Sequence, residues 1–403
     1  MSRFLINAVG ARMGGAVRHL SGFVDALAAE NPGETHTVCI SIPSDVVFSA
    51  KNVRVIPFTY RAGWLGRLIF DQVIVPWLAL RARSDILISL LNFGTLFPFI
   101  PQIVFQRNAL YYSDWSGKII SPRFWIPDRL RKNLIYWTMR ASDAIVTPTE
   151  AMRKMVLNAH PSIPAGKILV IPHGFDVEGF LASAESIPEK TAEILQTAPQ
   201  GRVRVLSVGH PAPYKGVDTL VAALAEIKRD GAKFSFFIPV DVSGGVNERR
   251  AVQGYDEAAK EYKRLVSDFG LLEEAVFLGW IPQKAISRIY KASDIFVFPS
   301  KCESFGFPML EAMSAGLPIV AADTETNREI LGDAALFYPP GDFSVLAVLL
   351  KKMISSPDLR ENMSGRSLAR LKIFDWGWGR YNASLMNLVE KISPAHEVLK
   401  LLR

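Results

Sequence analysis

Cysteine is scarce in this sequence of 403 residues, because Cys39 and Cys302 are the only two and lie far apart in the chain. Two distant cysteines build neither a disulfide framework nor a zinc site of the Cys-x-x-Cys type. A reducing compartment, the cytoplasm, is therefore expected. The chain start MSRFLINAVG has only a short apolar run before Gly10, so it favours a first β-strand over a signal peptide.

Several sequence motifs are also missing. No GxGxxG follows the first predicted strand, so a dinucleotide cofactor is not expected. The absence of a Walker A sequence and of GxSxG excludes a P-loop and a serine nucleophile elbow. Low-complexity tracts and short-period repeats are absent as well. What remains is a globular composition, 49% hydrophobic and 21% charged, that is long enough for two domains.

One uncharged segment, residues 86–106, is long enough to span a bilayer. Proline, glycine, asparagine and glutamine interrupt it, however. We therefore predict two buried parallel strands joined by a loop instead of a transmembrane helix.

Positive charge is confined to one half of the chain. Residues 1–180 contain 19 Lys and Arg against 12 Asp and Glu, a net charge of +7, and the remainder has 27 of each. Such asymmetry indicates either an anionic partner for the first half, such as a membrane surface, or simply a solvated basic face. No aromatic–basic recognition motif accompanies it, so nucleic acid is not an expected partner.

Strand-like and helix-like patterns alternate along both halves, which predicts an α/β fold with doubly wound parallel sheets. The alternation stops after Pro172-His173-Gly174, where a poorly patterned stretch rich in Ala, Ser and Glu follows, and restarts near residue 203. We therefore expect two domains, residues 1–175 and 176–375, with their functional loops at the carboxyl ends of the strands.

The most informative segment is residues 293–323, SDIFVFPSKCESFGFPMLEAMSAGLPIVAAD. A strand is followed by a loop with Glu303 and by a helix with Pro308 in its first turn, a favoured place for proline. Glu311 lies in that helix, and Gly306 permits close approach of a ligand to the backbone. Because helix N-termini bind anions, the pattern indicates a diphosphate site. The alternative is two surface glutamates near a helix start, where acids are favoured.

This pattern resembles glycosyltransferase family 4, a retaining family with the GT-B fold, over the second half and more loosely over the first. The resemblance implies two Rossmann-like domains facing across a cleft. The first, on the acceptor side, is completed by a C-terminal helix at about residues 376–403. The second binds a nucleoside diphosphate sugar, with no metal and no other cofactor, and the Asp-x-Asp triplet of the metal-dependent GT-A site is absent.

Individual roles follow from the same resemblance. Glu303 is expected to contact the donor sugar and Glu311 the ribose. The residues between them contact sugar and phosphate, and these are Ser304, Phe305, Gly306 and Phe307.

A second site lies in residues 206–224, LSVGHPAPYKGVDTLVAAL, where a strand leads into a helix. Lys215 at the strand's carboxyl end is suited to neutralise a leaving diphosphate, and the alternative is a solvated lysine at a helix start. Five residues earlier the family has Arg, whereas this chain has His210, which is not reliably charged at neutral pH. His210 is thus either a donor-binding or a structural residue.

Candidate residues in the first half are fewer. Gly14 and Gly15 follow the first strand and allow phosphate or sugar to approach the backbone. The family often places a histidine in the segment IVFQRNALYYSDW, but this chain has none there. Arg107 and Asn108 are expected to bind phosphate or acceptor instead. His173, in the interdomain segment, is expected to line the cleft or to be structural.

The acceptor is expected to be a glycan or a lipid-linked glycan. In residues 121–140 the apolar Ile126, Leu130, Leu134 and Trp137 share one helical face that is flanked by Arg129, Lys132 and Arg140. Such a helix either lies on an anionic membrane surface or packs into the core with a basic rim. Residues 239–255 depart from the short glycine turn of the family and predict an extra loop of unknown role.

The implied reaction is transfer of a hexose from a nucleoside diphosphate sugar with retention of configuration, as in mannosyltransferases of cell-surface polysaccharide assembly. The implied location is cytoplasmic, with a peripheral position at the inner membrane face as one interpretation. Two other interpretations remain open: a non-catalytic membrane-associated binding protein on a degenerate GT-B scaffold, and a GT-B sugar-nucleotide epimerase. The donor base and sugar and the linkage formed are not encoded in these patterns.

Overall fold

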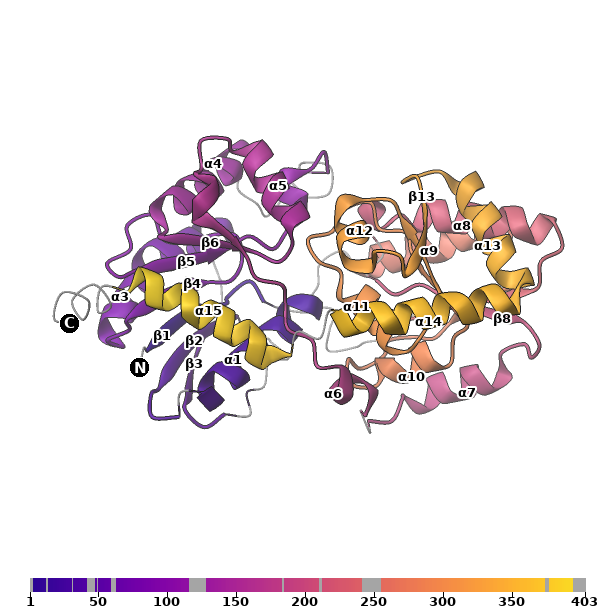
Figure 1. The fold of residues 1–403 in the computed structure, drawn as a ribbon, viewed down its shortest axis with the longest axis horizontal. Coiled ribbons are helices and arrows are strands. Elements are labelled where there is room, and N and C mark those ends of the chain that lie inside the picture. The colour runs from indigo at the N-terminus through magenta and orange to yellow at the C-terminus, as the bar shows by residue number, and fades with distance from the viewer. Residues whose placement is uncertain are drawn as a thin grey trace. The chain divides into compact units, whose positions relative to one another are not determined.

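The computed structural model divides into two compact units. Unit 1 is Met1–Phe175 with Trp376–Arg403, and unit 2 is Asp176–Asp375. Each contains one parallel sheet with helices on both of its faces (Figure 1). The structure describes residues 3–11, 14–30, 32–41, 48, 50–58, 63–115, 128–182, 185–209, 212–240, 255–373 and 377–393.

The sheet of unit 1 has seven parallel strands in the order β3-β2-β1-β4-β5-β6-β7. Its strands are β1 Phe4–Asn7, β2 His36–Ser41, β3 Val53–Phe58, β4 Ile86–Ser89, β5 Gln102–Phe105, β6 Ala144–Thr147 and β7 Ile168–Val170. The uncharged segment 86–106 forms β4, a loop and β5, as predicted. Within the described ranges, no helix has both the length and the apolar character needed to cross a membrane.

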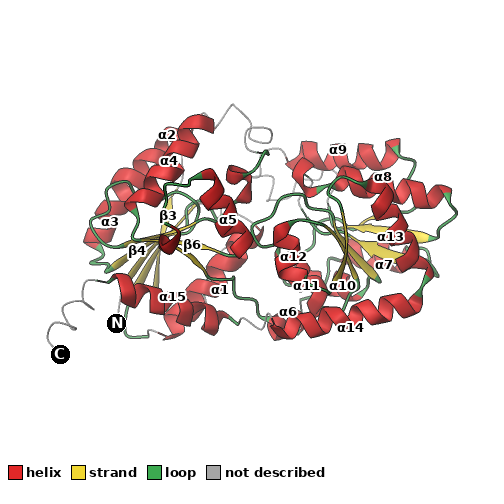
Figure 2. Ribbon diagram, turned by 45° about the horizontal axis from the view of Figure 1, so that its top comes forward, coloured by secondary structure: helices red, strands yellow, loops and turns green. Residues whose placement is uncertain are grey.

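Helices cover both faces of this sheet. They are α1 Gly14–Glu30, α2 Gly63–Ile69, α3 Val75–Arg81, α4 Asp128–Ala141, α5 Glu150–Ala159 and α15 Trp378–Ile392, with short turns η1 Phe70–Ile74, η2 Ala109–Tyr112 and η3 Ala165–Lys167. Figure 2 shows α1 and α15 on one side of the sheet and α2, α3 and α4 on the other. Residues 63–81 thus form two α-helices joined by the π-helical turn η1.

The sheet of unit 2 has six parallel strands in the order β10-β9-β8-β11-β12-β13. They are β8 Val203–Leu206, β9 Phe234–Ile238, β10 Ala275–Phe277, β11 Ile295–Phe298, β12 Ile319–Ala322 and β13 Ala335–Tyr338. The helices are α6 Val177–Leu181, α7 Glu189–Thr197, α8 Val217–Arg229, α9 Tyr255–Asp268, α10 Ile286–Lys291, α11 Phe307–Ser314, α12 Glu325–Leu331, α13 Phe343–Ser355 and α14 Pro357–Ile373, with the turn η4 Pro213–Lys215.

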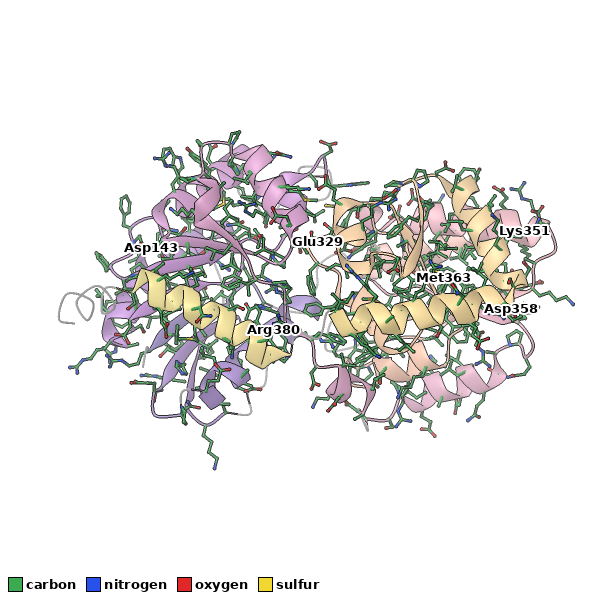
Figure 3. All side chains as sticks on the ribbon, in the orientation of Figure 1. Asp143, Glu329, Lys351, Asp358, Met363 and Arg380 are labelled. Atoms are coloured by element: carbon green, nitrogen blue, oxygen red, sulfur yellow. The ribbon has the colours of Figure 1, made fainter. Side chains whose placement is uncertain are left out.

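The poorly patterned stretch after residue 176 contains two of these helices, α6 and α7. Helix α7 has too short an apolar pattern to be recognised, and it is anchored by a polar contact. The buried Thr191 hydroxyl donates to the carbonyl oxygen of Leu278, at 2.8 Å. Helix α14 buries Met363 in the core of unit 2, whereas Arg380 on α15 of unit 1 is exposed (Figure 3).

Both sheets reverse their strand order beside their first strand. In unit 1 the reversal lies between β1 and β4, and in unit 2 it lies between β8 and β11. Loops that leave two such strands run to opposite faces of the sheet and leave room for a ligand at the carboxyl edge. Lys215 and Glu303 follow the two strands at the reversal of unit 2. In unit 1, Gly14 and Gly15 follow β1, whereas Arg107 follows β5 and His173 follows β7.

Candidate functional site

In unit 2 the loops after β8 and β11 are held tightly against each other. Gly216 has φ +68°, and a Cβ there would come within 2.1 Å of the carbonyl oxygen of Pro299. Nearby, the Lys301 N–H donates to the carbonyl oxygen of Tyr214, at 2.8 Å. A residue without a side chain is needed where two backbones approach so closely. This contact sets the position of Lys215 relative to the loop after β11.

Lys215 and Glu303 meet across that contact. The Lys215 Nζ lies 2.5 Å from the Glu303 Oε1, and both side chains are largely buried. The Thr326 hydroxyl at the start of α12 donates to the Glu303 carbonyl oxygen, at 3.0 Å, and fixes the loop from the other side. Burial acts to lower the pKa of Lys215, but Glu303 and Tyr214 outweigh it and raise that pKa above its ordinary value. Lys215 is therefore a firmly charged ammonium group.

The helix after this loop begins in the manner expected of an anion site. Gly306 precedes α11 in a left-handed conformation with φ +88°, and Pro308 lies in the first turn. Phe305 and Phe307 are buried and pack edge to face with ring centroids 5.3 Å apart. The phenyl rings thus anchor the loop. Their positions leave the backbone, together with the half-buried Ser304, as the groups suited to contact a ligand.

Glu311 is 4% exposed and lies inside unit 2. The Tyr290 hydroxyl donates to its Oε2, at 2.8 Å, and the Gln283 Nε2 donates to its Oε1, at 3.1 Å. A carboxylate has about four acceptor positions, so these two bonds orient it without exhausting its capacity. The sequence analysis did not identify Tyr290 and Gln283, because no local pattern shows that α10 and the residues before it lie beside α11.

In unit 1 the structure brings Arg107, His173 and Gly15 together. The Arg107 Nε donates to the His173 Nε2, at 3.2 Å, and its Nη2 donates to the Gly15 carbonyl oxygen, at 3.4 Å. Gly14 begins α1. Asn108 is used differently, because its side chain accepts the Leu110 N–H and so caps the turn η2. The Asn108 side chain therefore has a structural role, and its expected role in ligand binding stays a prediction.

His19 is a buried residue of this cluster that the sequence analysis missed. Its ring lies 4.3 Å from the His173 ring, and its Nε2 lies 2.8 Å from the Tyr381 hydroxyl oxygen on α15. Burial, with the added repulsion of Arg107, lowers the pKa of His19 and of His173 well below its ordinary value. Burial also lowers the pKa of Arg107 to about 10. The sequence signal that could have identified His19 is its position one helical turn after Gly15.

The C-terminal helix is locked onto this cluster. The Trp378 ring of α15 fills the space beside two glycines, Gly22 and Gly174, where an added Cβ would come within 2.1 and 2.5 Å of it. Helix α15 packs against α1 in the core of unit 1. The chain's end is thus part of the first domain's structure.

A second polar network lies at the carboxyl end of β1. The Asn7 Nδ2 donates to the Asp71 Oδ1, at 2.8 Å, and Arg67 forms an ion pair with the same carboxylate. Burial raises the pKa of Asp71, while Arg67 and Asn7 partly offset that effect. The three side chains meet beside Gly10 near the strand-order reversal, and their sequence separation concealed them.

Some predicted positions fall outside the described residues. These are His210, residues 241–254 of the predicted extra loop, and residues 121–127 of the predicted amphipathic helix. The described part of that helix turns Leu130 and Trp137 outward and buries Ile135 and Met139. The core-packed interpretation of its Leu130–Trp137 face was therefore wrong.

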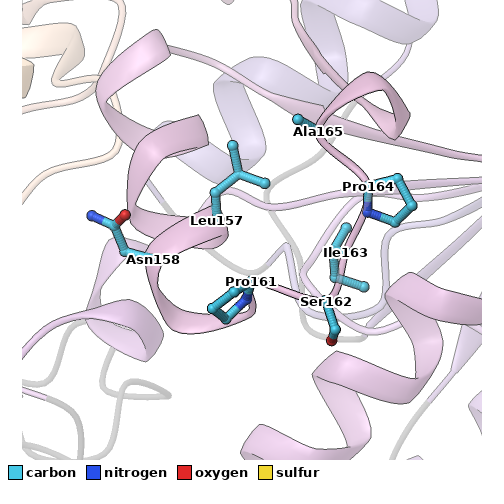
Figure 4. A pocket seen from close by; sticks show the side chains of 7 residues that line it. All are labelled: Leu157, Asn158, Pro161, Ser162, Ile163, Pro164 and Ala165. Atoms are coloured by element: carbon cyan, nitrogen blue, oxygen red, sulfur yellow. The ribbon is translucent and has the colours of Figure 1, made fainter.

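Two further observations, a surface pocket and the placement of potential metal ligands, do not indicate a functional site. Figure 4 shows a surface pocket between the end of α5 and the following loop, lined by Leu157, Asn158, Pro161, Ser162, Ile163, Pro164 and Ala165. It precedes β7 and so lies at the amino edge of the sheet, away from the residues above. Across the described ranges, no three His, Cys, Asp or Glu side chains group as a metal site would require.

Comparison with known proteins agrees with this division of the chain. Residues 190–369 match the family model "Glycosyl transferases group 1", and residues 13–178 match "Glycosyltransferase Family 4". The two matches fall almost entirely within unit 2 and unit 1, respectively. Together they cover most of the sequence.

Individual proteins are similar at modest identity. The O-antigen chain mannosyltransferase B of Escherichia coli is 25% identical over 300 residues, which are 67% of this chain and 74% of that protein. A D-inositol 3-phosphate glycosyltransferase of Kineococcus radiotolerans is 28% identical over 250 residues, but this chain spans only 55% of its length. The structure of sucrose-phosphate synthase from Thermosynechococcus elongatus shares the fold, with TM-score 0.75, 18% identity and coverage of 98% of this chain and 100% of that one.

Proposed function

We propose, from the premise that this chain is a glycosyltransferase with the GT-B fold, that it transfers a hexose from a nucleoside diphosphate sugar to a glycan or lipid-linked glycan. The observation that carries the proposal is the Lys215–Glu303 pair beside the left-handed Gly306 at the start of α11. A fixed cation and a helix N-terminus at the same sheet edge form a site for a diphosphate.

Charge develops on the diphosphate as the sugar leaves, and Lys215 is positioned to stabilise it. The ion pair with Glu303 holds the ammonium group in place before any donor binds. Preorganised charge of this kind stabilises a transition state because the protein does not have to reorganise during the reaction. When Lys215 binds the diphosphate instead of Glu303, the Glu303 carboxylate becomes available to accept hydrogen bonds from the sugar hydroxyls. No metal is required for this charge balance.

Glu311 is assigned to the ribose of the donor. A vicinal diol donates two hydrogen bonds to one carboxylate, and such charge-assisted bonds are stronger than neutral ones. Tyr290 and Gln283 hold the carboxylate in orientation. Of these two partners, Gln283 is exposed and is the one that a bound nucleotide would displace.

The acceptor side is assigned to unit 1, where Gly15, Arg107 and His173 meet. Similarity to an O-antigen chain mannosyltransferase supports a mannosyl or other hexosyl transfer in cell-surface polysaccharide assembly. A cytoplasmic location is consistent with Cys39 and Cys302, which are both buried and form no disulfide bond. Retention of configuration rests on the resemblance to the retaining family, with the leaving phosphate taking the proton of the acceptor hydroxyl.

A thermal-shift and hydrolysis screen against UDP-, GDP-, ADP- and dTDP-sugars tests the proposal. One nucleotide is expected to raise the melting temperature, because a ligand that binds only the folded state stabilises it. Glu311→Ala should abolish that shift, whereas Lys228→Ala, which breaks the 2.7 Å ion pair with Glu274 at the far end of α8, should retain it. No shift with any nucleotide sugar would favour a degenerate scaffold, and an epimerised nucleotide sugar as product would favour an isomerase.

A further inference from the structure

The outer face of the helical layer formed by α2, η1 and α3 is apolar. Between residues 65 and 80, all of the exposed residues that the structure describes are large and hydrophobic. These residues are Leu65, Ile69, Val73, Trp77 and Leu80, and we call them the apolar stripe. Val73 is 61% and Trp77 54% exposed. The solvent face of a surface helix is normally polar, so this pattern is inverted.

The spacing explains why the five side chains form one stripe. They recur at four, four, four and three residues, the interval that places side chains on one helical face. The opposite face of this helical layer packs against the sheet. Its buried residues belong to one hydrophobic core cluster, and they are Phe70, Val75, Leu78 and Ala79. The apolar stripe is thus additional to the core.

Two phenylalanines lie beside this helical segment. The backbone at residues 94–96 is tied to η1, since the Gln72 Nε2 donates to the Gly94 carbonyl oxygen, at 3.0 Å, and the Leu96 N–H donates to the Gln72 Oε1, at 2.8 Å. Phe97 and Phe99 follow directly and are 81% and 68% exposed. Fixed backbone therefore holds two aromatic rings in solvent next to the apolar stripe.

The charges around the stripe are almost all positive. Residues 50–113 contain seven Lys and Arg but only two Asp, at positions 71 and 85. Asp71 is buried and paired with Arg67. At the end of the stripe Arg81 and Arg83 are exposed, and the Arg81 guanidinium lies 5.3 Å from the centre of the Trp77 ring. The exposed charged residues at this end of the stripe, Arg81 and Arg83, are thus cationic.

We propose that the apolar stripe with Phe97 and Phe99 docks unit 1 onto the surface of an anionic lipid bilayer. Apolar side chains insert at the boundary between headgroups and acyl chains, Trp prefers that interface, and flanking arginines attract anionic headgroups. Helix α4, on the same side of the sheet, adds the exposed Leu130 and Trp137 (Figure 2). The identity of a lipid-linked acceptor rests on the proposed function, but the binding itself does not.

A bilayer fits this surface better than a second copy of the chain. Two copies that met through the stripe would bring together two surfaces whose exposed charges between residues 65 and 83 are all positive, and like charges oppose such contact. Anionic headgroups instead complement them. A surface that combines exposed aliphatic and aromatic side chains with exposed arginines has the composition of an interfacial membrane segment.

Flotation with vesicles tests the proposal. The full chain should float with vesicles of phosphatidylcholine mixed with phosphatidylglycerol at low salt, less at high salt, and weakly with phosphatidylcholine alone. Val73→Gln with Trp77→Gln should reduce the bound fraction by about tenfold or more, since each large apolar side chain contributes that order of affinity when buried. The matched control is Val348→Gln with Phe343→Gln on α13, which removes two exposed apolar side chains from unit 2 and should bind like the unaltered chain.

Three results would overturn the proposal: no flotation with the anionic vesicles, equal flotation of the stripe variant, or a dimer in sedimentation equilibrium that the stripe variant alone abolishes. Circular dichroism must show that both double variants are folded. The nucleotide-sugar thermal shift, measured on the same variants, should be unchanged. Flotation without any thermal shift would mean that the proposed function fails while the docking surface stands.

Discussion

The two units share a strand order over six strands but differ in the side chains that gather at the carboxyl ends of those strands. In unit 2, a charged lysine and glutamate meet beside two glycines in the left-handed conformation. In unit 1, two neutral buried histidines, an arginine and a tyrosine form a closed cluster. Their outer layers differ as well, because α13 of unit 2 mixes Val345 and Val348 with exposed Lys351 and Lys352, whereas the stripe of unit 1 has no exposed polar residue between its members.

This difference teaches that topology fixes where a site lies but not its chemistry. Both sheets direct two loops to the same edge. The residues in those loops then decide whether the edge holds a charged pair suited to an anion or a closed cluster of buried polar side chains. Changes to the charged pair and its loop in unit 2 and to the buried histidines in unit 1 should therefore have different consequences.

Loss of Lys215 should produce the largest effect. Lys215→Ala is expected to lower turnover by about 10²-fold or more, the usual result of removing one preorganised electrostatic contact to the transition state. The measurement is the rate of sugar transfer or donor hydrolysis with the nucleotide sugar identified in the screen. Lys228→Ala breaks an ion pair of similar length in the same unit and should leave the rate within about twofold. Equal rates for the two variants would remove Lys215 from the site.

Gly216 should be the most sensitive backbone position of unit 2. Gly216→Ala adds a Cβ at φ +68° that collides with the Pro299 carbonyl oxygen, so the two loops must separate. We expect a loss of about 2 kcal/mol or more in the free energy of unfolding in urea, together with loss of donor binding. Gly201→Ala is the matched control, since its φ is +74° but nothing lies within 4 Å of its Cβ. That variant isolates backbone strain, which should cost about 1 kcal/mol, and a similar loss in both would show that the loop contact is unimportant.

Mild acid should destabilise unit 1 more than unit 2. The pKa of each of four described histidines, His19, His36, His160 and His173, is lowered first of all by burial, and all four belong to unit 1. Below the unfolded pKa of about 6.5 the unfolded chain takes up protons that the folded chain does not. Stability is therefore full above that pH and is lost as the pH falls below it.

Hydrogen exchange of unit 1 and unit 2 peptides between neutral pH and pH 5 measures this difference, after correction for the intrinsic pH dependence of exchange. Each unit of pKa shift corresponds to about 1.4 kcal/mol. His173→Gln should flatten the pH dependence of unit 1, because one of the buried titrating groups is gone. A greater loss of protection in unit 2 than in unit 1 would contradict the expectation.

The sequence predicted the parts of this molecule that depend on local order. Alternating patterns located both sheets, and the loop with Glu303 was identified because its strand, glycine and proline are consecutive in the chain. The partners of Glu311 and the His19–Tyr381 contact were missed, because they join elements 21 and 362 residues apart. The apolar stripe was also missed as a surface, since its period is the same as that of a core-facing helix and only burial of the opposite face distinguishes the two.

The smallest effect is expected from metal removal. If Lys215 and the start of α11 carry the charge balance in unit 2, a chelator should leave the transfer rate unchanged within error, and added Mg²⁺ should not raise it. The informative variant is Lys215→Ala, whose residual activity shows whether a divalent cation can replace the missing ammonium group. Rescue by Mg²⁺ in that variant alone would show that the site needs positive charge at this position and that lysine normally supplies it. Loss of activity in the unaltered enzyme on chelation would instead place a metal in the reaction and reduce Lys215 to a supporting residue.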